Sequence, residues 1–515
     1  MSILQQLNNY KSMKRLTLLA AIFAMVFAGV TATASAQEAT YTPRIVPAPM
    51  QCDLSATNYV AFEKVTISTD ATEAGKWAKD HFALWYKKLA PKVIQVPFKG
   101  AEGHKEAYTV SIDKSGVKIT AKNIEGVRHA LHSLRQIAMP GRGTQKVESY
   151  IVPVGYISDY PSMNFRGLHI CWFPETQEWE IERMIRLAGY YKINYVVLEQ
   201  WGTYQSKVAP WLCWPNPPMT KKAIKKMVAI SKDLGITLIP QLNIFGHASF
   251  SRSKAGKHAT LDIHPEYQPL FEPLAGWNWC LSNPETNKLI KALIVEMLED
   301  FDNPPFFHIG CDEAHMPSCP ECSKMPYSKL FVDHIKSIHK MLAERGVRAM
   351  MWQDMLLKKG DPRWKGYKAN GTTETAKAAE SLPKDIVICD WYYREPVKEF
   401  KSYAYFKELG YDHLACPWDR ISAITAEAKA AKENGSWGVL GTLWNHYDGY
   451  SLALVYCNVA GRTWNTEART AKYGSYSAFK THLREIGWDM KLKNYREFGI
   501  NHYQVPYDNM PNPLL

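Results

Sequence analysis

Eight short apolar runs recur through the last two thirds of the chain, and stretches with helical spacing of apolar residues separate them. Runs of this length, apolar at successive positions, are typical of strands buried on both faces, as in parallel sheets. Eight such strands alternating with helices predict an α/β fold with a closed (β/α)8 TIM barrel. The predicted strands are residues 165–171, 195–199, 237–242, 306–311, 347–352, 386–389, 413–417 and 439–444.

The pattern upstream of the barrel differs. Residues 106–113 alternate between apolar and polar positions, 114–116 form a turn, and 117–121 alternate again, which predicts a β-hairpin. A helix follows, with apolar residues on one face between 127 and 137. We therefore expect a small α+β accessory domain over residues 37–160, and a catalytic barrel with a C-terminal helical segment over residues 161–515.

The first 36 residues have the layout of a secretory signal peptide. Basic residues precede an apolar run over 16–30, and small residues end in Ala34-Ser35-Ala36. The run is shorter than the roughly 20 residues that a membrane span needs. We expect export to a periplasm or to the outside of the cell, without a stable membrane span.

Composition and charge indicate which classes of binding partner to expect. Among 515 residues, 62 Lys and Arg against 50 Asp and Glu give a formal net charge of +12. The basic residues are scattered, and the lysines within 221–226 lie opposite an apolar helix face. A solvated helix face explains them better than a nucleic-acid site does, so we expect no nucleic-acid partner.

The 10 cysteines are too sparse for a disulfide scaffold in an exported chain of this size. One metal-like spacing occurs, Cys319-Pro320-Glu321-Cys322. A single CxxC is weak grounds for zinc, and a local disulfide or free thiols explain it at least as well. The sequence shows no cofactor motif, and we predict neither a cofactor nor a catalytic metal.

The fourth apolar run leads into two adjacent carboxylates, Asp312 and Glu313. Side chains alternate along a strand, so both can enter one site only if the strand ends there. At the C-terminal rim of a barrel that position is where catalytic residues collect. Neighbouring carboxylates raise each other's proton affinity, which suits one as a general acid and the other as an anion. The alternative is an acidic pair at the start of the next helix.

Aromatic and polar residues follow most of the other predicted strands. Sugar rings present apolar C–H faces and a hydroxyl rim, so a site of this composition suits a glycan. The candidates taken from these positions are Arg166, His247, Trp352, Asp354, Trp391, Tyr392, Tyr393 and Trp444.

The segment from His308 to Ala314 is similar to the H-x-G-x-D-E signature of glycoside hydrolase family 20, the β-N-acetylhexosaminidases. Further motifs of the family occur in the same order along the chain, at Arg166, Gly246-His247 and Trp444. The resemblance covers nearly all of the chain after the signal peptide. It implies a glycan or glycoconjugate substrate with a terminal N-acetylhexosamine.

The resemblance also implies residue roles. In substrate-assisted catalysis the sugar's 2-acetamido oxygen attacks the anomeric carbon with retention of configuration. Glu313 would then be the general acid and base, and Asp312 would orient the acetamido N–H. The acetamido oxygen would be bound by Tyr393 or by its neighbour Tyr392.

The remaining candidates would bind the sugar around this centre. Arg166 would clamp its hydroxyls, and Trp352, Trp391 and Trp444 would wall the N-acetyl pocket. His247 would lie near the acid, with a satisfied histidine at a strand end as the alternative.

The chain departs from the family pattern where the outer sugar hydroxyls are bound. Pro240-Gln241 stands where Pro-Glu is common, no acidic pair follows the second strand, and Asn445 and His446 follow Trp444. A modified hexosamine, for example a sulfated one, is therefore a further hypothesis. A disaccharide-releasing glycosidase and a non-catalytic glycan-binding protein are two more. Linkage, sugar preference and oligomeric state stay open.

Overall fold

The computed structural model describes residues 45–70, 72–86, 90–95, 104–140, 150–249, 260–273, 276–444, 449–468 and 474–491. The predicted signal peptide, residues 1–36, lies outside this part of the chain, as do Asn445 and His446. No helix in these ranges is both long enough and apolar enough to cross a bilayer.

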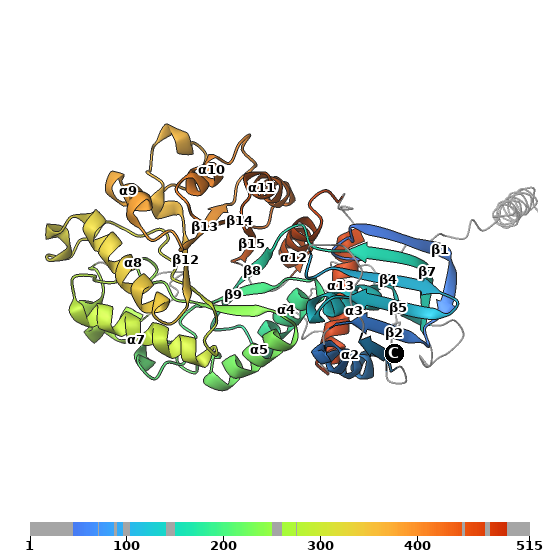
Figure 1. Cartoon of the computed structure of the whole chain (residues 1–515). Helices are drawn as coiled ribbons and strands as arrows, with labels where there is room; N and C mark the ends of the chain where they lie inside the picture. Colours follow the sequence, from blue (N-terminus) through green and yellow to red (C-terminus); the bar gives the residue numbers. More distant parts are fainter. Residues whose placement is uncertain are drawn as a thin grey trace, which may run out of the picture.

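The eight predicted strands form a closed barrel in which every neighbouring pair is parallel (Figure 1), which confirms the TIM-barrel prediction. The strands are β8 (Phe165–Trp172), β9 (Tyr195–Gln200), β10 (Thr237–Gln241), β11 (Phe306–His308), β12 (Arg348–Trp352), β13 (Val387–Tyr392), β14 (His413–Pro417) and β15 (Gly438–Leu443).

Helices surround the barrel because each buries one apolar face against the strands. In α5, the Thr220 side chain accepts a hydrogen bond from the N–H of Ala223 and so caps the first turn. Gly235 follows the helix at φ +73°, the left-handed conformation that ends a helix most easily in glycine. The barrel helices are α4 (Glu178–Tyr190), α5 (Lys221–Asp233), α7 (Pro284–Asp300), α8 (Tyr327–Ala343), α9 (Thr373–Ser381), α10 (Lys401–Glu408), α11 (Ile421–Asn434) and α12 (Gly449–Trp464).

Strand β11 is shorter than the apolar run that predicts it. The run continues to Cys311, but the strand ends at His308. Gly310 and Cys311 have φ values of +67° and +76°, which a strand does not accommodate. At Gly310 an added Cβ would lie 1.9 Å from Oδ1 of Asn243, so only glycine fits. This turn delivers the two carboxylates to the barrel rim.

The accessory domain contains a seven-stranded sheet in the order β1-β7-β4-β5-β2-β3, with the short β6 beside β7. The predicted hairpin is present, because β4 and β5 pair antiparallel from Tyr108–Ala121 to Asp113–Gly116. Its elements are β1 (Gln51–Ala61), β2 (Val65–Thr69), α2 (Thr72–Trp85), β3 (Lys92–Gln95), β4 (Tyr108–Asp113), β5 (Gly116–Ala121), α3 (Ile124–Ile137), β6 (Met139–Pro140) and β7 (Tyr150–Asp159).

The last described helix, α13 (Gly474–Asp489), ties the accessory domain to the barrel (Figure 1). Asp489 pairs with Arg135 of α3 at 2.7 Å, and Glu485 accepts a hydrogen bond from Tyr190 of α4 at 2.8 Å. One helix thus contacts helices of both domains through two acidic side chains, which fixes their relative position.

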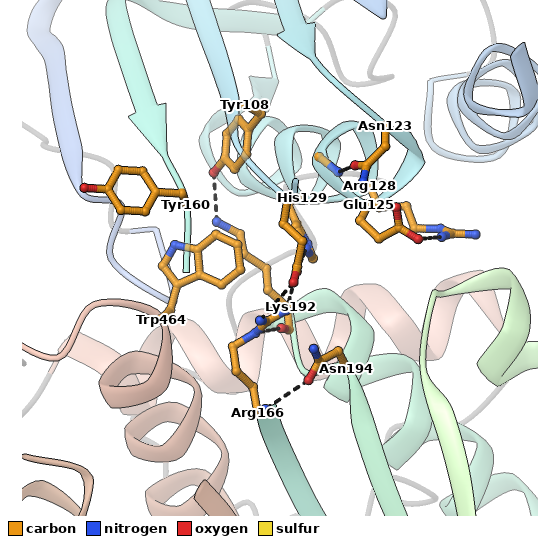
Figure 2. Close-up of polar contacts among 12 residues, drawn as sticks. Tyr108, Asn123, Glu125, Arg128, His129, Tyr160, Arg166, Lys192, Asn194 and Trp464 are labelled. Atoms are coloured by element: carbon orange, nitrogen blue, oxygen red, sulfur yellow. Dashed lines mark hydrogen bonds and ion pairs between the residues drawn. The ribbon is translucent and has the colours of Figure 1, made fainter. Parts of the chain in front are cut away.

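Charged side chains also fill the interface at the N-terminal end of the barrel strands. Arg166, near the start of β8, pairs with Glu106 of the accessory domain at 2.5 Å, and Figure 2 shows it pointing toward that domain. Burial opposes the charge on Glu106, but Arg166 and the hydrogen bond from His129 outweigh it, so the pKa of Glu106 is lowered.

A second buried pair lies beside the first. Lys192 contacts Asp159 at 2.9 Å and donates to the Tyr108 hydroxyl at 2.8 Å. The indole N–H of Trp464 donates to the other oxygen of Asp159 at 2.8 Å. Both charges are fully buried, and each has an opposite charge and hydrogen bonds beside it, which is the condition under which buried charges are tolerated.

Candidate active site

Both carboxylates of the acidic pair approach one histidine. Nε2 of His247 lies 3.1 Å from Oδ2 of Asp312 and 3.7 Å from Oε2 of Glu313. The backbone makes this possible because Cys311 and Glu313 adopt φ values of +76° and +47°, which break the alternation of a strand. Asp312 is buried, whereas the Glu313 side chain is 39% exposed and open to a substrate.

The histidine comes from the segment after β10. His247 has a φ of +57°, and an added Cβ at Gly246 would lie 2.6 Å from the carbonyl oxygen of Asp312. Glycine at position 246 is therefore required for the close approach of two backbone segments. This approach brings the imidazole to the acidic pair, as the sequence resemblance implies.

Two residues that the sequence does not single out contact Glu313. The indole N–H of Trp277 donates to the backbone carbonyl of Glu313 at 2.8 Å, and its ring lies 4.2 Å from that of His247. Nζ of Lys368 lies 3.8 Å from Oε1 of Glu313. Trp277 and Lys368 belong to long loops without a motif, so only the fold brings them here.

Asp354 lies behind the acidic pair and not on the sugar-facing surface. Its Oδ2 accepts hydrogen bonds from the backbone N–H of Glu313 at 2.9 Å and from Asn370 at 2.8 Å. It is fully buried, and this burial, together with the nearby charge of Asp312, raises the pKa of Asp354 to about 7. The expected substrate contact is thus corrected: Asp354 positions the backbone of Glu313.

Three tryptophans and a tyrosine line the barrel interior beside the acids. The Trp352 and Trp444 rings lie 6.0 Å apart, and those of Trp391 and Tyr393 lie 4.9 Å apart. The indole N–H of Trp444 donates to the Tyr393 hydroxyl at 2.9 Å. The structure brings these four predicted residues together as an apolar surface with a polar edge.

The two neighbouring tyrosines point in opposite directions. Tyr393 packs with the interior cluster of Trp352, Trp391 and Trp444. Tyr392 belongs to the outer core between strands and helices, and its hydroxyl donates to the carbonyl of Glu395 at 2.8 Å. The sequence left both open as the binder of the acetamido oxygen, and the geometry favours Tyr393.

Arg166 is not part of this site. It lies near the start of β8, whereas the acids follow the end of β11, and all its side-chain hydrogen bonds run to Glu106, Lys192 and Met163. Because the barrel strands are parallel, the two positions lie at opposite ends of the barrel. The expected hydroxyl clamp is therefore corrected: Arg166 is an interdomain residue.

A buried polar group beneath the tryptophans was also missed. Nε2 of His169 lies 2.9 Å from Oε2 of Glu199, and both are fully buried. Asn243 donates to the other oxygen of Glu199 at 2.8 Å, and the His169 ring lies 4.5 Å from that of Trp444. The apolar runs that contain them concealed these residues. This polar group packs against Trp352 and Trp444 and so supports their position in the site.

Two groups of side chains in the described ranges have donor atoms close enough to share a metal ion. One is His169, Cys171 and Glu199, whose donors already bond to one another. The other is Glu272, Cys280, Cys319 and Cys322, next to the segment that carries Glu313.

Comparison with known families gives two matches. Residues 193–451 match the model "Glycosyl hydrolase family 20, catalytic domain", and residues 42–160 match "Glycosyl hydrolase family 20, domain 2". The first match covers every barrel strand except β8 and includes the acidic pair, His247 and the four aromatic residues.

Curated relatives are distant. A lacto-N-biosidase of Bifidobacterium bifidum is 26% identical over 374 residues, which are 66% of this chain and 29% of that protein. A beta-hexosaminidase of Porphyromonas gingivalis is 25% identical over 365 residues, 61% of this chain and 45% of that one. The chain thus spans less than half the length of these relatives.

Solved structures share the fold. An exo beta-N-acetylglucosaminidase from Vibrio harveyi superposes with a TM-score of 0.65 at 16% identity, covering 90% of this chain and 79% of that one. A beta-N-acetylhexosaminidase from Bacteroides fragilis gives a TM-score of 0.63 at 15% identity, covering 88% and 97%. At such identities the likeness concerns the architecture.

Proposed function

Because the chain belongs to glycosyl hydrolase family 20, we propose that it is an exported, exo-acting β-N-acetylhexosaminidase. It would remove terminal β-linked N-acetylglucosamine or N-acetylgalactosamine from glycans with retention of configuration. The observation that carries the proposal is the approach of Asp312 and Glu313 to His247 on the barrel rim beside an aromatic wall. A buried carboxyl group next to a more exposed one suits two different roles.

In the proposed first step the sugar supplies its own nucleophile. The acetamido carbonyl oxygen forms a bond to the anomeric carbon as the bond from that carbon to the glycosidic oxygen breaks. Glu313, as a carboxylic acid, donates its proton to the departing oxygen. Asp312 accepts a hydrogen bond from the acetamido N–H and stabilises the positive charge of the oxazolinium ion.

The second step reverses the proton transfer. Glu313, now a carboxylate, takes a proton from water as the water oxygen bonds to the anomeric carbon and the oxazolinium ring opens. Attack on the face that the leaving group vacated restores the original configuration. The same residue thus serves as acid and then as base.

The surrounding residues would hold the acetamido group in its attacking conformation. Trp352, Trp391 and Trp444 supply apolar contact to its methyl group and to the sugar face. The Tyr393 hydroxyl accepts from Trp444, which leaves its own proton available for the acetamido oxygen. Nε2 of His247 lies 3.1 Å from Oδ2 of Asp312, where the imidazole would hold that carboxylate toward the substrate.

The direct test compares two aryl glycosides. The account expects rapid release of p-nitrophenol from p-nitrophenyl β-N-acetylglucosaminide, and none above background from p-nitrophenyl β-glucoside, which lacks the acetamido group. Proton NMR early in the reaction should show the β-anomer of free N-acetylglucosamine. Equal turnover of both substrates would overturn substrate assistance, and no turnover of any aryl N-acetylhexosaminide would favour a glycan-binding protein.

A second candidate follows from the B. bifidum relative, which is named a lacto-N-biosidase. A disaccharide-releasing activity would require room beyond the first sugar. Turnover of p-nitrophenyl lacto-N-bioside that exceeds turnover of the monosaccharide substrate would select this candidate.

A third candidate function is hydrolysis of a glycan whose terminal hexosamine carries an anionic group. It rests on the net charge of +12 and on Lys368, which is half-exposed beside Glu313. Comparing plain and 6-sulfated p-nitrophenyl N-acetylglucosaminide decides it, and equal or better use of the plain sugar would reject it.

A further inference from the structure

Three cysteines and a glutamate gather beside the acid-bearing segment, although they are far apart in sequence. Glu272 and Cys280 lie in the loop before α7, each next to one residue of the antiparallel β-bridge between Phe271 and Trp279. Cys319 and Cys322 follow Glu313 in the loop before α8. All four are buried, with relative exposures of 4%, 6%, 8% and 1% in sequence order, and their donor atoms lie within 4.8 Å of one another.

The sulfur spacing fits one tetrahedral ion. Sγ of Cys280 lies 3.6 Å from Sγ of Cys319 and 3.9 Å from Sγ of Cys322. With a zinc–sulfur distance of about 2.3 Å, two ligands of a tetrahedral site lie about 3.8 Å apart. These two sulfur–sulfur distances therefore already match the separation that a shared zinc ion imposes.

The glutamate is oriented as a fourth ligand. Its Oε2 accepts hydrogen bonds from the backbone N–H groups of Ser318 and Cys319, both at 2.7 Å. Its Oε1 has no hydrogen-bond partner within the described ranges, although the side chain is buried. A carboxylate that is fixed through one oxygen, while its other oxygen is buried and makes no hydrogen bond to a described residue, has the arrangement of a metal ligand supported by its neighbours.

Backbone groups further suit negatively charged sulfur. The N–H of Cys322 donates to Sγ of Cys319 at 3.2 Å, and the N–H of Ser282 donates to Sγ of Cys322 at 3.3 Å. Thiolates are the form in which cysteine binds metals. A disulfide would use two of the three thiols and leave the third buried beside it with Glu272, so pairing does not explain the full set.

We propose that Cys280, Cys319, Cys322 and Glu272 bind one structural Zn²⁺ ion. Four protein ligands complete a tetrahedron and leave no position for a substrate or a reactive water, which is typical of a structural site. This assignment extends the single CxxC spacing of the sequence with two ligands from a loop about 40 residues upstream. It does not depend on the proposed function.

The ion would join the two loops that hold Glu313. From the first loop, Trp277 donates to the carbonyl of Glu313, and Asn278 exchanges two hydrogen bonds with the backbone of His315 at 2.7 and 3.1 Å. From the second loop come Cys319 and Cys322. A metal at their junction would fix the position of the acid without taking part in the reaction.

Metal analysis of the full chain tests the proposal. Protein produced with zinc and purified without chelator should contain about one zinc per chain by inductively coupled plasma mass spectrometry. A mercurial thiol reagent should release it, detected with a zinc dye. The Cys319→Ser variant should lose the zinc, whereas Cys213→Ser should retain it, because Cys213 lies outside the cluster. The wild-type release assay remains decisive if Cys319→Ser does not fold.

The fourth ligand has its own test. Glu272→Gln removes the negative charge but keeps an oxygen for the Ser318 and Cys319 amides, and should lower zinc affinity at least about tenfold in a chelator competition. Unchanged affinity would overturn the assignment of Glu272. A metal-free wild type that does not take up added zinc, a bound iron, or a mapped disulfide among these cysteines would overturn the site. Metal content is independent of turnover, so these outcomes are distinct from failure of the proposed activity.

Discussion

The two ends of the barrel carry their charges in opposite ways. At the N-terminal end Arg166 pairs with Glu106 and Lys192 with Asp159, and both pairs are buried between the domains. At the C-terminal end two carboxyl groups converge on His247, and Glu313 remains partly exposed. Opposite charges paired in a buried interface favour stability, whereas two adjacent carboxyl groups at an open rim favour acid–base chemistry.

The comparison also shows that residues in similar sequence contexts can have different roles. Arg166 and Trp352 both lie on barrel strands within the family's motifs, yet only Trp352 is near a strand end that faces the acids. Position along the strand decides the role, because the loops after the C-terminal ends form the pocket. Substitutions at the C-terminal end should therefore lower enzymatic turnover, whereas substitutions at the N-terminal end should lower the free energy of unfolding.

The largest effect is expected at Glu313. Glu313→Gln keeps the shape but removes the transferable proton, so kcat should fall by about 10²- to 10⁴-fold. The melting temperature should not change, because the side chain is partly exposed. The measurement is aryl N-acetylglucosaminide turnover beside thermal unfolding, with Glu433→Gln on α11 as the exposed control. A fall in kcat below tenfold would contradict the role as acid.

The opposite end should lose stability instead. Arg166→Met leaves the Glu106 carboxylate buried without its main partner, which should lower the free energy of unfolding by about 3–5 kcal/mol. Arg420→Met is the matched control, because its pair with Glu395 at 2.6 Å is exposed and worth at most about 1 kcal/mol. Urea unfolding measures both.

Steady-state kinetics of the folded Arg166→Met variant separate a loss of stability from a loss of substrate binding. Arg166→Met should leave KM and kcat per folded molecule unchanged under conditions where the variant is native. A selective rise in KM would indicate that Arg166 contacts the substrate, and would contradict its interdomain role.

A smaller effect should distinguish the paired tyrosines. Tyr393→Phe removes the hydroxyl that accepts the Trp444 N–H and should lower kcat/KM by about tenfold, the worth of one positioned hydrogen bond. Tyr392→Phe removes an outward-facing hydroxyl and should leave kcat/KM unchanged. Steady-state kinetics on one substrate compare them, and the reverse order would exchange their assignments.

The smallest effect is a change in pH dependence. Burial and the charge of Asp312 raise the pKa of Asp354 to about 7, against about 4 in an unfolded chain. Between these values the folded state holds a proton that the unfolded state has lost, so this group makes the free energy of unfolding fall as pH rises. Asp354→Asn should flatten the fall between about pH 4 and 7 in urea unfolding. Identical slopes in both proteins would contradict the raised pKa.

The sequence predicted the barrel well because eight apolar runs and their helices leave few other topologies. It also placed Asp312 and Glu313 at the rim, since two adjacent carboxylates cannot share a site within a regular strand. It could not assign Tyr392 and Tyr393 to opposite faces, because the residue at which β13 ends is a property of the fold.

Errors arose where a role depends on distant partners. The motif predicts a substrate contact for Arg166, but Glu106 of the other domain determines what Arg166 contacts. Asp354 follows a strand as a catalytic residue would, yet its partner is the backbone of Glu313. The sequence does not indicate Cys280 and Glu272 as ligands, because a metal site assembled from two loops has no local spacing to recognise.

The most direct measurement is a crystal structure with an N-acetylglucosamine-thiazoline inhibitor, which mimics the oxazolinium ion. The account predicts the bicyclic ring against Trp352, Trp391 and Trp444, with the Asp312 carboxylate within hydrogen-bond distance of the ring nitrogen and Glu313 beside the anomeric carbon. Arg166 should keep its pairing with Glu106. An inhibitor bound elsewhere, or an Asp312 side chain turned away from the ring nitrogen, would contradict the account.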